Sequence, residues 1–142
     1  MRITDLLDAR SVSLTSSPKT KSEALDQAVA LMTKSGKIND EEAYRSQVYA
    51  REEESTTGIG EGIAIPHGKC DAVSRPGLAA MVIKNGVDFD SLDGEPVTLL
   101  FLIAAPNTKD NVHLDVLSKL SVMLMDEEFT ENLRNEIGRA HV

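Results

Sequence analysis

Two stretches in the first half of the chain repeat apolar residues every three or four positions, the period of a helix with one buried face. The apolar residues of the first stretch are Leu25, Ala28, Val29 and Met32. Thr20-Lys21-Ser22-Glu23 has the form of a capping box at the start of this helix, and Gly36 is its stop signal. In the second stretch Asp40 is the N-cap, and one side of the helix carries Ala43, Tyr44, Val48 and Arg51. We therefore predict two consecutive helices.

The pattern then changes to short apolar runs of strand length. The predicted strands are Ile63–Ile65, Leu78–Lys84, a short one at Val87 and Phe89, and the run "PVTLLFLIAAP" that ends at Pro106. This last run is apolar almost throughout, as is typical of a strand covered on both faces. Asn85-Gly86 and Leu92-Asp93-Gly94 predict tight turns between the strands.

Helical spacing returns after Pro106-Asn107. The residues that share one face of the predicted helix are His113, Val116, Leu117, Leu120 and Leu124. Asp126 caps a last helix that carries Phe129, Leu133 and Ile137. Helices before, between and after buried strands predict a single α/β domain, in which a mixed β-sheet is flanked by helices on both faces. We expect this domain to span residues 1–142, either alone or as a piece of a longer chain.

The length and composition of the chain limit its domain count, its binding partners and its cellular location. The 142 residues suit one domain, and their 15 basic and 23 acidic side chains give a formal net charge of −8. An acidic chain without a basic stripe argues against a nucleic-acid partner, but it does not exclude a small anion or a basic protein. One cysteine, Cys70, allows no internal disulfide, and no apolar run is long enough to enter a membrane. We predict a cytoplasmic protein without direct membrane insertion.

The segment "GIGEGIAIPHG", residues 58–68, places a histidine among glycines. Ile63 stands where a dinucleotide-binding fingerprint needs its third glycine, and Gly68-Lys69-Cys70 does not complete a Walker A loop. Zinc is a weak possibility, because His67 and Cys70 lack a matching second pair. The glycines let the backbone approach a ligand closely. Their N–H groups can form an anion-binding concavity, with His67 at its end.

A neutral imidazole near pH 7 is a nucleophile that can attack phosphorus and form a covalent N–P intermediate. Phosphoryl transfer needs mainly alignment and charge stabilisation, and Arg51 and His113 are the candidates for that role. Plainer interpretations stay open from the residues alone. A histidine in a glycine turn is more often a surface residue, and His113 on an apolar helix face suits a hydrogen-bonded boundary position. Arg51, followed by three glutamates, is most simply part of a solvated charge cluster.

Two quoted stretches, "REEESTTGIGEGIAIPHG" and "FLIAAPNTKDNVHLDVLSKLSVML", resemble the fructose/mannitol-type (type 2) IIA domain of the bacterial phosphoenolpyruvate-dependent sugar phosphotransferase system. The resemblance covers nearly the whole chain, and by comparison with that family we expect part of the usual C-terminal tail to be missing. It implies that His67 accepts the phosphoryl group. It also implies that His113 helps to stabilise that group and that Arg51 lies near the phosphoryl oxygens.

The resemblance implies a phosphotransferase with a phosphohistidine intermediate. Phosphorylated HPr would be the donor, and a cysteine of a IIB domain would be the acceptor during uptake of a fructose-like sugar. It implies no metal and no other cofactor. The alternative within the same family is a nitrogen-related regulatory IIA protein, which acts by phosphorylation-dependent protein binding. A third hypothesis, a non-catalytic ligand-binding module, predicts that the protein is never phosphorylated. The motifs do not separate the first two, and they identify neither the sugar nor the oligomeric state.

Overall fold

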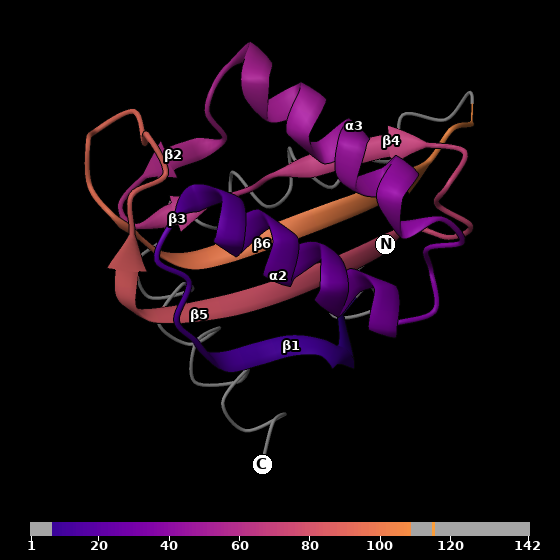
Figure 1. The fold of residues 1–142 in the computed structure, drawn as a ribbon, viewed down its shortest axis with the longest axis horizontal. Helices are drawn as coiled ribbons and strands as arrows, with labels where there is room; N and C mark the ends of the chain where they lie inside the picture. Colours follow the sequence, from indigo (N-terminus) through magenta and orange to yellow (C-terminus); the bar gives the residue numbers. More distant parts are fainter. Residues whose placement is uncertain (1–6, 109–114, 116–142) are drawn as a thin grey trace.

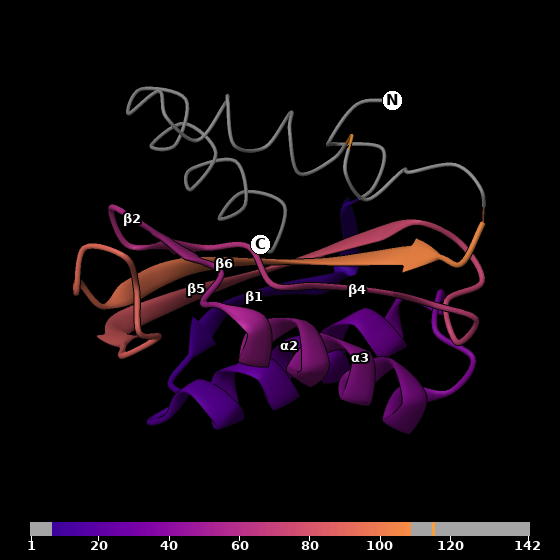
Figure 2. The same ribbon diagram turned by 90° about the horizontal axis from the view of Figure 1, so that it is seen from above.

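A computed structural model describes residues 7–108 and 115 of the chain. The elements are β1 (Leu7–Ser16), α2 (Lys21–Lys34), α3 (Glu41–Glu54), β2 (Gly58–Gly60), β3 (Ile63–Ala64), β4 (His67–Cys70), β5 (Gly77–Val87) and β6 (Val97–Pro106). The six strands form one mixed sheet. Figure 1 shows α2 and α3 crossing in front of this sheet, and the edge-on view of Figure 2 places both helices on the same face.

The predicted caps begin both helices. The Thr20 hydroxyl accepts a hydrogen bond from Glu23 N at 3.1 Å, and the Asp40 carboxylate accepts one from Ala43 N at 3.1 Å. The Glu23 carboxylate reaches back to Lys19 N, one residue before the cap, at 2.7 Å. These contacts satisfy N–H groups that have no partner within the first turn of a helix.

Strand β6 lies inside the sheet, antiparallel to β5 and parallel to β3 and β4. β3 and β4 follow one another along the same side of β6, with Ile63 opposite Leu99 and His67 opposite Ile103. Pro66 has no N–H to add to the ladder, but its carbonyl accepts from Ile103 N at 3.0 Å. The backbone at His67 is therefore held in register by the most buried strand of the sheet.

The core confirms that β6 is covered on both faces. One face of the sheet packs against the helices through Met81 of β5 and Leu100 and Leu102 of β6. Alternation along the strand turns Leu99 and Phe101 to the other face, and both are fully buried. Each such side chain contributes about 1.5–3 kcal/mol by leaving water.

The sheet differs from the sequence prediction in several places, and three of its strands, β1, β2 and β4, were not predicted. β1 was not predicted because polar residues interrupt its apolar pattern. One of them, the buried Ser11, donates its hydroxyl hydrogen to Leu78 O at 3.0 Å. The turn predicted at Asn85-Gly86 is wrong, since β5 continues through it to Val87. Gly86 has a φ of +75°, and the pairing with β6 shifts register between Val82 and Val87, so the glycine absorbs a bulge instead of reversing the chain. Phe89 lies in a loop rather than a strand and is fully buried.

The remaining predictions have mixed outcomes. The turn at Leu92-Asp93-Gly94 is present, with Gly94 N donating to Ser91 O at 2.9 Å. The helices predicted beyond Pro106, and with them the cover expected on the second face of the sheet, lie outside the described residues. Neither α2 nor α3 is long and apolar enough to cross a membrane.

Candidate active site

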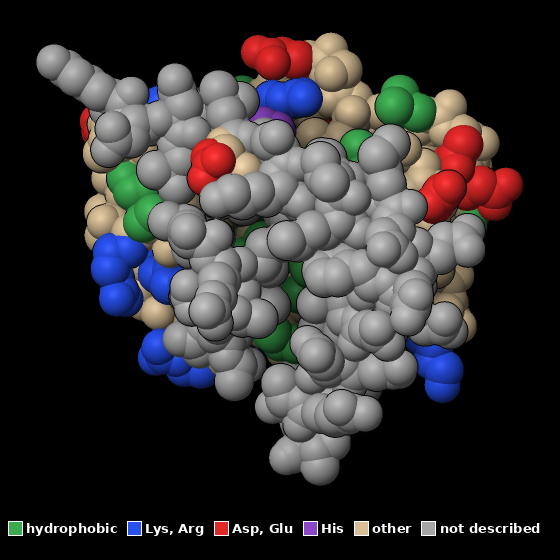
Figure 3. All heavy atoms as spheres, turned by 180° about the vertical axis from the view of Figure 1, so that it is seen from behind, with side chains coloured by type: hydrophobic (Ala, Val, Ile, Leu, Met, Phe, Trp, Pro, Cys, Tyr) green, Lys and Arg blue, Asp and Glu red, His purple; other side chains and the backbone are tan. Residues whose placement is uncertain are grey.

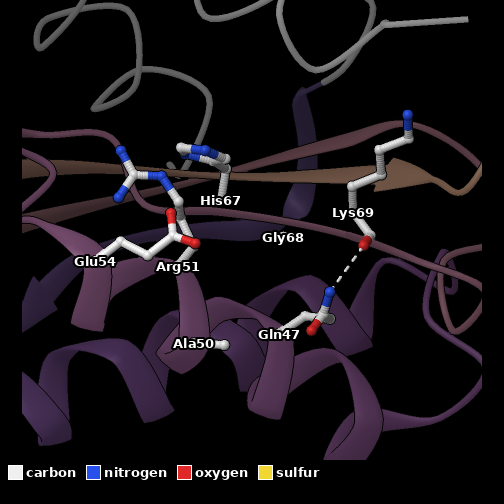
Figure 4. A pocket seen from close by; sticks show the side chains of 7 residues that line it. All are labelled: Gln47, Ala50, Arg51, Glu54, His67, Gly68 and Lys69. Atoms are coloured by element: carbon white, nitrogen blue, oxygen red, sulfur yellow. Dashed lines mark hydrogen bonds between the residues drawn. The ribbon is translucent and has the colours of Figure 1, made fainter.

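A hollow of about 290 Å³ opens between the end of α3 and the beginning of β4. It is lined by Gln47, Ala50, Arg51, Glu54, His67, Gly68 and Lys69. The structure thus brings together two of the three predicted site residues, Arg51 from the helix and His67 from the strand. Figure 4 shows both side chains rising at the same end of the hollow. The third residue, His113, lies outside the described residues.

His67 is the first residue of β4 and is half-buried. Its Nδ1 lies 3.2 Å from Ile65 O. A carbonyl oxygen can only accept, so this contact requires Nδ1 to carry the proton. The lone pair of the neutral ring is then on Nε2. The backbone of the preceding turn therefore selects one nitrogen of His67 as the nucleophile.

Gly68 brings the helix and the strand into close contact beside His67. A Cβ at this position would lie 3.1 Å from Tyr44 Cε1 and 3.1 Å from Val48 Cγ2. Tyr44 is fully buried and its hydroxyl donates to Ile103 O at 2.8 Å, and burial raises the pKa of that hydroxyl well above its usual value of 10.0. Arg51 follows Val48 by about one helical turn. Because α3 packs closely against β4 at Gly68, Arg51 lies near His67 and lines the same hollow.

Arg51 lies in the last turn of α3. Its Nη1 donates to Ser55 O at 3.0 Å, so the guanidinium bonds to backbone just past the helix end. A cation is also favoured there by the negative end of the helix dipole. The other guanidinium nitrogens, Nε and Nη2, are donors of the kind that bind phosphoryl oxygens in a fixed fork.

The three glutamates after Arg51 are not one solvated cluster. Glu53 and Glu54 are exposed, but Glu52 is buried. Its Oε2 accepts from Thr57 N at 2.8 Å and its Oε1 from the Thr57 hydroxyl at 2.5 Å. Sequence reasoning missed this residue. The available signal was that Tyr44, Val48 and Glu52 follow one another at four-residue spacing, which places Glu52 on the buried face of α3.

The glycine segment is a hairpin that leads into the site. β2 and β3 pair with Gly60 opposite Ile63. The two residues between them, Glu61 and Gly62, have φ of 57° and 79°, the signs of a type I′ turn.

The anion expected at these glycines is a side chain of the protein itself. The Asp93 carboxylate accepts from Glu61 N at 2.9 Å and from Glu95 N at 3.0 Å. These hydrogen bonds lower the pKa of Asp93 below 3.8. The prediction that the N–H groups of the turn form an anion site next to His67 is therefore wrong for Glu61 N, because Asp93 accepts its hydrogen bond.

Lys69 and Cys70 complete β4. Gln47 Nε2 donates to Lys69 O at 3.3 Å, and the Lys69 side chain extends away from the Arg51 end of the hollow (Figure 4). Figure 3 shows the molecule from the face opposite the helices, where atoms of a histidine side chain reach the surface beside basic and acidic side chains.

His67 and Cys70 are three residues apart in one strand and so point to opposite faces. They cannot bind one zinc ion, and the described residues contain no cluster of three or more side chains that could hold a metal ion.

The fold and the hollow define a mixed α/β domain with an imidazole and a guanidinium at the edge of the sheet. The chain belongs to the family described as "Phosphoenolpyruvate-dependent sugar phosphotransferase system, EIIA 2", which matches residues 5–140. Fructose/mannitol-type IIA membership, expected from the sequence, is thus confirmed.

Curated relatives show how this domain is used in other proteins. The chain is 46% identical over 133 residues to the PTS system fructose-specific EIIABC component of Bacillus subtilis, covering 94% of this chain and 21% of that protein. It is 42% identical over 122 residues to the fructose-specific EIIA component of Haloferax volcanii, covering 86% and 79%. It is also 34% identical over 115 residues to a nitrogen regulatory protein of Pseudomonas aeruginosa, covering 81% and 75%. The chain therefore spans about a fifth of the Bacillus relative.

Solved structures share the fold. The nitrogen regulatory protein IIA-Ntr from Neisseria meningitidis has a TM-score of 0.85 at 27% identity, with 99% of each chain covered. IIA mannitol from Escherichia coli has a TM-score of 0.78 at 30% identity, covering 96% of this chain and 99% of that one. A complex of enzyme IIA mannitol with phosphorylated enzyme IIB mannitol from the same organism has a TM-score of 0.73 at 29% identity, covering 96% and 88%.

Proposed function

We propose that this chain is a phosphotransferase that accepts a phosphoryl group on His67 from phosphorylated HPr and passes it to a cysteine of a IIB domain. The observation that carries the proposal is that His67 and Arg51, from separate elements, line one hollow. An open hollow with a nucleophile on one side and a fixed cation on the other suits the transfer of a dianionic group between proteins.

The chemical step is a transfer between two imidazoles. His67 Nε2 attacks phosphorus in line, the N–P bond of the donor breaks, and the donor ring recovers that electron pair. His67 then carries the phosphoryl group on Nε2 and the original proton on Nδ1, so its ring is cationic. The Ile65 carbonyl, 3.2 Å from Nδ1, favours this cation without a proton transfer. The guanidinium of Arg51 offsets the charge of the phosphoryl oxygens as they pass.

The roles of the partners and of His113 come from the family. The resemblance assigns His113 to the stabilisation of the phosphoryl group. The solved complex of a IIA mannitol enzyme with a phosphorylated IIB mannitol enzyme supports a IIB domain as the acceptor. The names of the Bacillus and Haloferax relatives support a fructose-like sugar. Transfer between such partners would take place in the cytoplasm.

Incubation with phosphoenolpyruvate, enzyme I and HPr tests the proposal. Intact-mass measurement should show one added phosphoryl group that is labile in acid and stable in base, as an N–P bond is. His67→Gln should prevent the addition, whereas the matched variant His141→Gln should leave it unchanged. Label on the His67→Gln protein would show that the acceptor is wrong. An unlabelled wild type would favour the non-catalytic ligand-binding module.

A regulatory function is the second candidate. It is favoured by the Pseudomonas nitrogen regulatory protein, 34% identical, and by the TM-score of 0.85 to IIA-Ntr. A chase experiment separates the two: purified phosphoprotein is mixed with a fructose-type IIB domain, and label on each chain is followed. Transfer to the IIB cysteine supports sugar uptake. Retention of the label on His67, with HPr still able to take it back, supports the regulatory function.

A further inference from the structure

Beyond the residues that line the hollow, we infer that Glu52 is the positioning residue of this site: its buried carboxylate fixes the tautomer and orientation of His67 and the place of Arg51. The inference rests on the proposed function for its kinetic test, but its structural basis does not. Glu52 does not touch the hollow. Its contacts form a short path of hydrogen bonds that ends at the imidazole.

The path has three steps. Glu52 Oε2 accepts from Thr57 N at 2.8 Å. Thr57 O accepts from Ile65 N at 3.0 Å. Ile65 O then faces His67 Nδ1 at 3.2 Å. The first step joins the carboxylate to backbone, the second joins two backbone groups, and the third joins backbone to the ring. The position of the Glu52 carboxylate therefore sets where the Ile65 carbonyl lies beside the imidazole.

The same carboxylate also holds the helix end. Lys21 Nζ, in the first turn of α2, lies 2.9 Å from Glu52 Oε2. That ammonium is 4.7 Å from the centre of the Phe89 ring, and the Thr56 hydroxyl donates to Phe89 O at 2.8 Å. The side chain of Glu52 is only 5% exposed. A buried charge with this set of partners resists displacement, because leaving any partner unpaired is costly.

Arg51 is the residue next to Glu52, and the two side chains leave the helix in different directions. The Glu52 side chain is buried in the protein, whereas the Arg51 side chain lines the hollow, as Figure 4 shows. Fixing Glu52 therefore fixes the last turn of α3 from which the guanidinium extends. One buried carboxylate thus sets both sides of the site, the imidazole through the backbone path and the guanidinium through the helix.

The test needs a variant that removes the hydrogen-bond acceptor but keeps the fold. The double variant Lys21→Met and Glu52→Met replaces the buried pair with apolar side chains of similar length, an exchange that is often neutral for stability. Glu52→Gln is the conservative variant: its amide oxygen still accepts from Thr57 N and Lys21, and its NH₂ group can donate to the Thr57 hydroxyl. Glu53→Met, at an exposed neighbouring position, is the control for side-chain type.

Two measurements decide the outcome. The ¹⁵N chemical shifts of the His67 ring report the tautomer without any donor, and phosphorylation by phospho-HPr gives kcat and KM. We expect wild type, Glu52→Gln and Glu53→Met to show the Nδ1–H tautomer and similar kcat. The folded double variant should show mixed tautomers and a kcat lowered about 10- to 100-fold, as expected for a misplaced reacting group, with KM unchanged because the docking surface is intact.

Unchanged ring shifts and unchanged kcat in the folded double variant would overturn the inference. A rise in KM together with a fall in kcat and an intact tautomer would also overturn it, because that result indicates a general loss of structure. If the double variant does not fold, Glu52→Asp decides by the same ring shifts, since its carboxylate is too short to hold both Thr57 and Lys21. If wild type is not phosphorylated, the proposed function fails, and the tautomer measurement still tests Glu52.

Discussion

The two sides of the hollow hold their functional groups by different means. On the strand side, His67 is held by backbone: β4 is in register with β6, and the ring bonds to the carbonyl two residues before it. On the helix side, the Arg51 guanidinium bonds to Ser55 O, and the helix that carries Arg51 is held by side chains, through the buried Glu52 and through Tyr44. A nucleophile that must attack in line gains from a rigid frame. The guanidinium of Arg51 forms no bond to phosphorus, so a position at a helix end is sufficient for it. The predictions below separate these two kinds of support.

The largest expected effect comes from replacing Arg51, on the helix side of the hollow, and it should change the rate of phosphoryl transfer but not the stability. Arg51→Ala should slow phosphorylation by HPr by a factor of about 10²–10³, because it removes the fixed charge that meets the phosphoryl oxygens. Stability should change little, since the side chain is not in the core. Arg51→Lys should recover only part of the rate, because an ammonium lacks the fork of donors. Arg75→Ala, which removes an exposed arginine, is the control, and single-turnover transfer is the measurement. A normal rate in Arg51→Ala would remove this residue from the site.

The next effect is on the strand side and should change stability and transfer together. In Gly68→Ala the new Cβ meets Tyr44 and Val48 at 3.1 Å, so these side chains of α3 must give by a few tenths of an ångström, and we expect the helix to shift with them. We expect a loss of about 1–3 kcal/mol in the free energy of unfolding, the usual cost of overpacking, and slower phosphorylation because Arg51 moves with the helix.

Gly36→Ala is the matched control for that substitution. Its Cβ meets nothing within 4 Å, but its φ of +80° makes alanine strained. Urea unfolding should therefore show a cost of about 1–2 kcal/mol, with normal transfer. Equal transfer rates in the two alanine variants would show that close packing at Gly68 does not place the site.

A smaller effect should follow from loosening the helix without moving the strand. Tyr44→Phe removes only the hydroxyl that donates to Ile103 O at 2.8 Å. The cost to unfolding should be about 1 kcal/mol, typical of one hydrogen bond with a partner left buried. Phosphorylation should slow less than in Gly68→Ala. Thermal unfolding and transfer rates measure the two effects, and a larger kinetic loss than that of Gly68→Ala would reverse the order of support argued here.

The smallest expected effect is on stability, depends on pH, and comes from Asp93, which binds the β2–β3 hairpin that precedes β4. Hydrogen bonds from Glu61 N and Glu95 N lower the pKa of Asp93 below 3.8. A carboxyl group with a lowered pKa in the folded state stabilises the protein above its unfolded pKa, and this stability is lost as pH falls through the folded pKa. Asp93→Asn should therefore be less stable than wild type at neutral pH, and the difference should shrink below pH 3.8. Urea unfolding at the two pH values measures it, and a constant difference would contradict the assignment.

Local patterns predicted some regions well and others not at all. The caps at Thr20 and Asp40 depend on residues three positions away, and the structure has both. Asn85-Gly86 has an equally strong local signal, yet β5 continues through it. Its long pairing with β6 outweighs the preference of two residues. The pairing partner is the next strand, where Val97 pairs with Val87, and a two-residue turn signal carries no information about that pairing.

The sequence by itself determined the helices α2 and α3, the doubly buried β6 and the residue types His67 and Arg51, because each follows from periods and motifs within a few residues. Only the tertiary structure decided that His67 uses Nδ1 to bond the backbone, that Asp93 binds the glycine turn and that Glu52 is buried. These outcomes depend on partners distant in the chain or on the path of the backbone. Burial and hydrogen bonding are settled by what packs against a residue, and that is known only once the chain has folded.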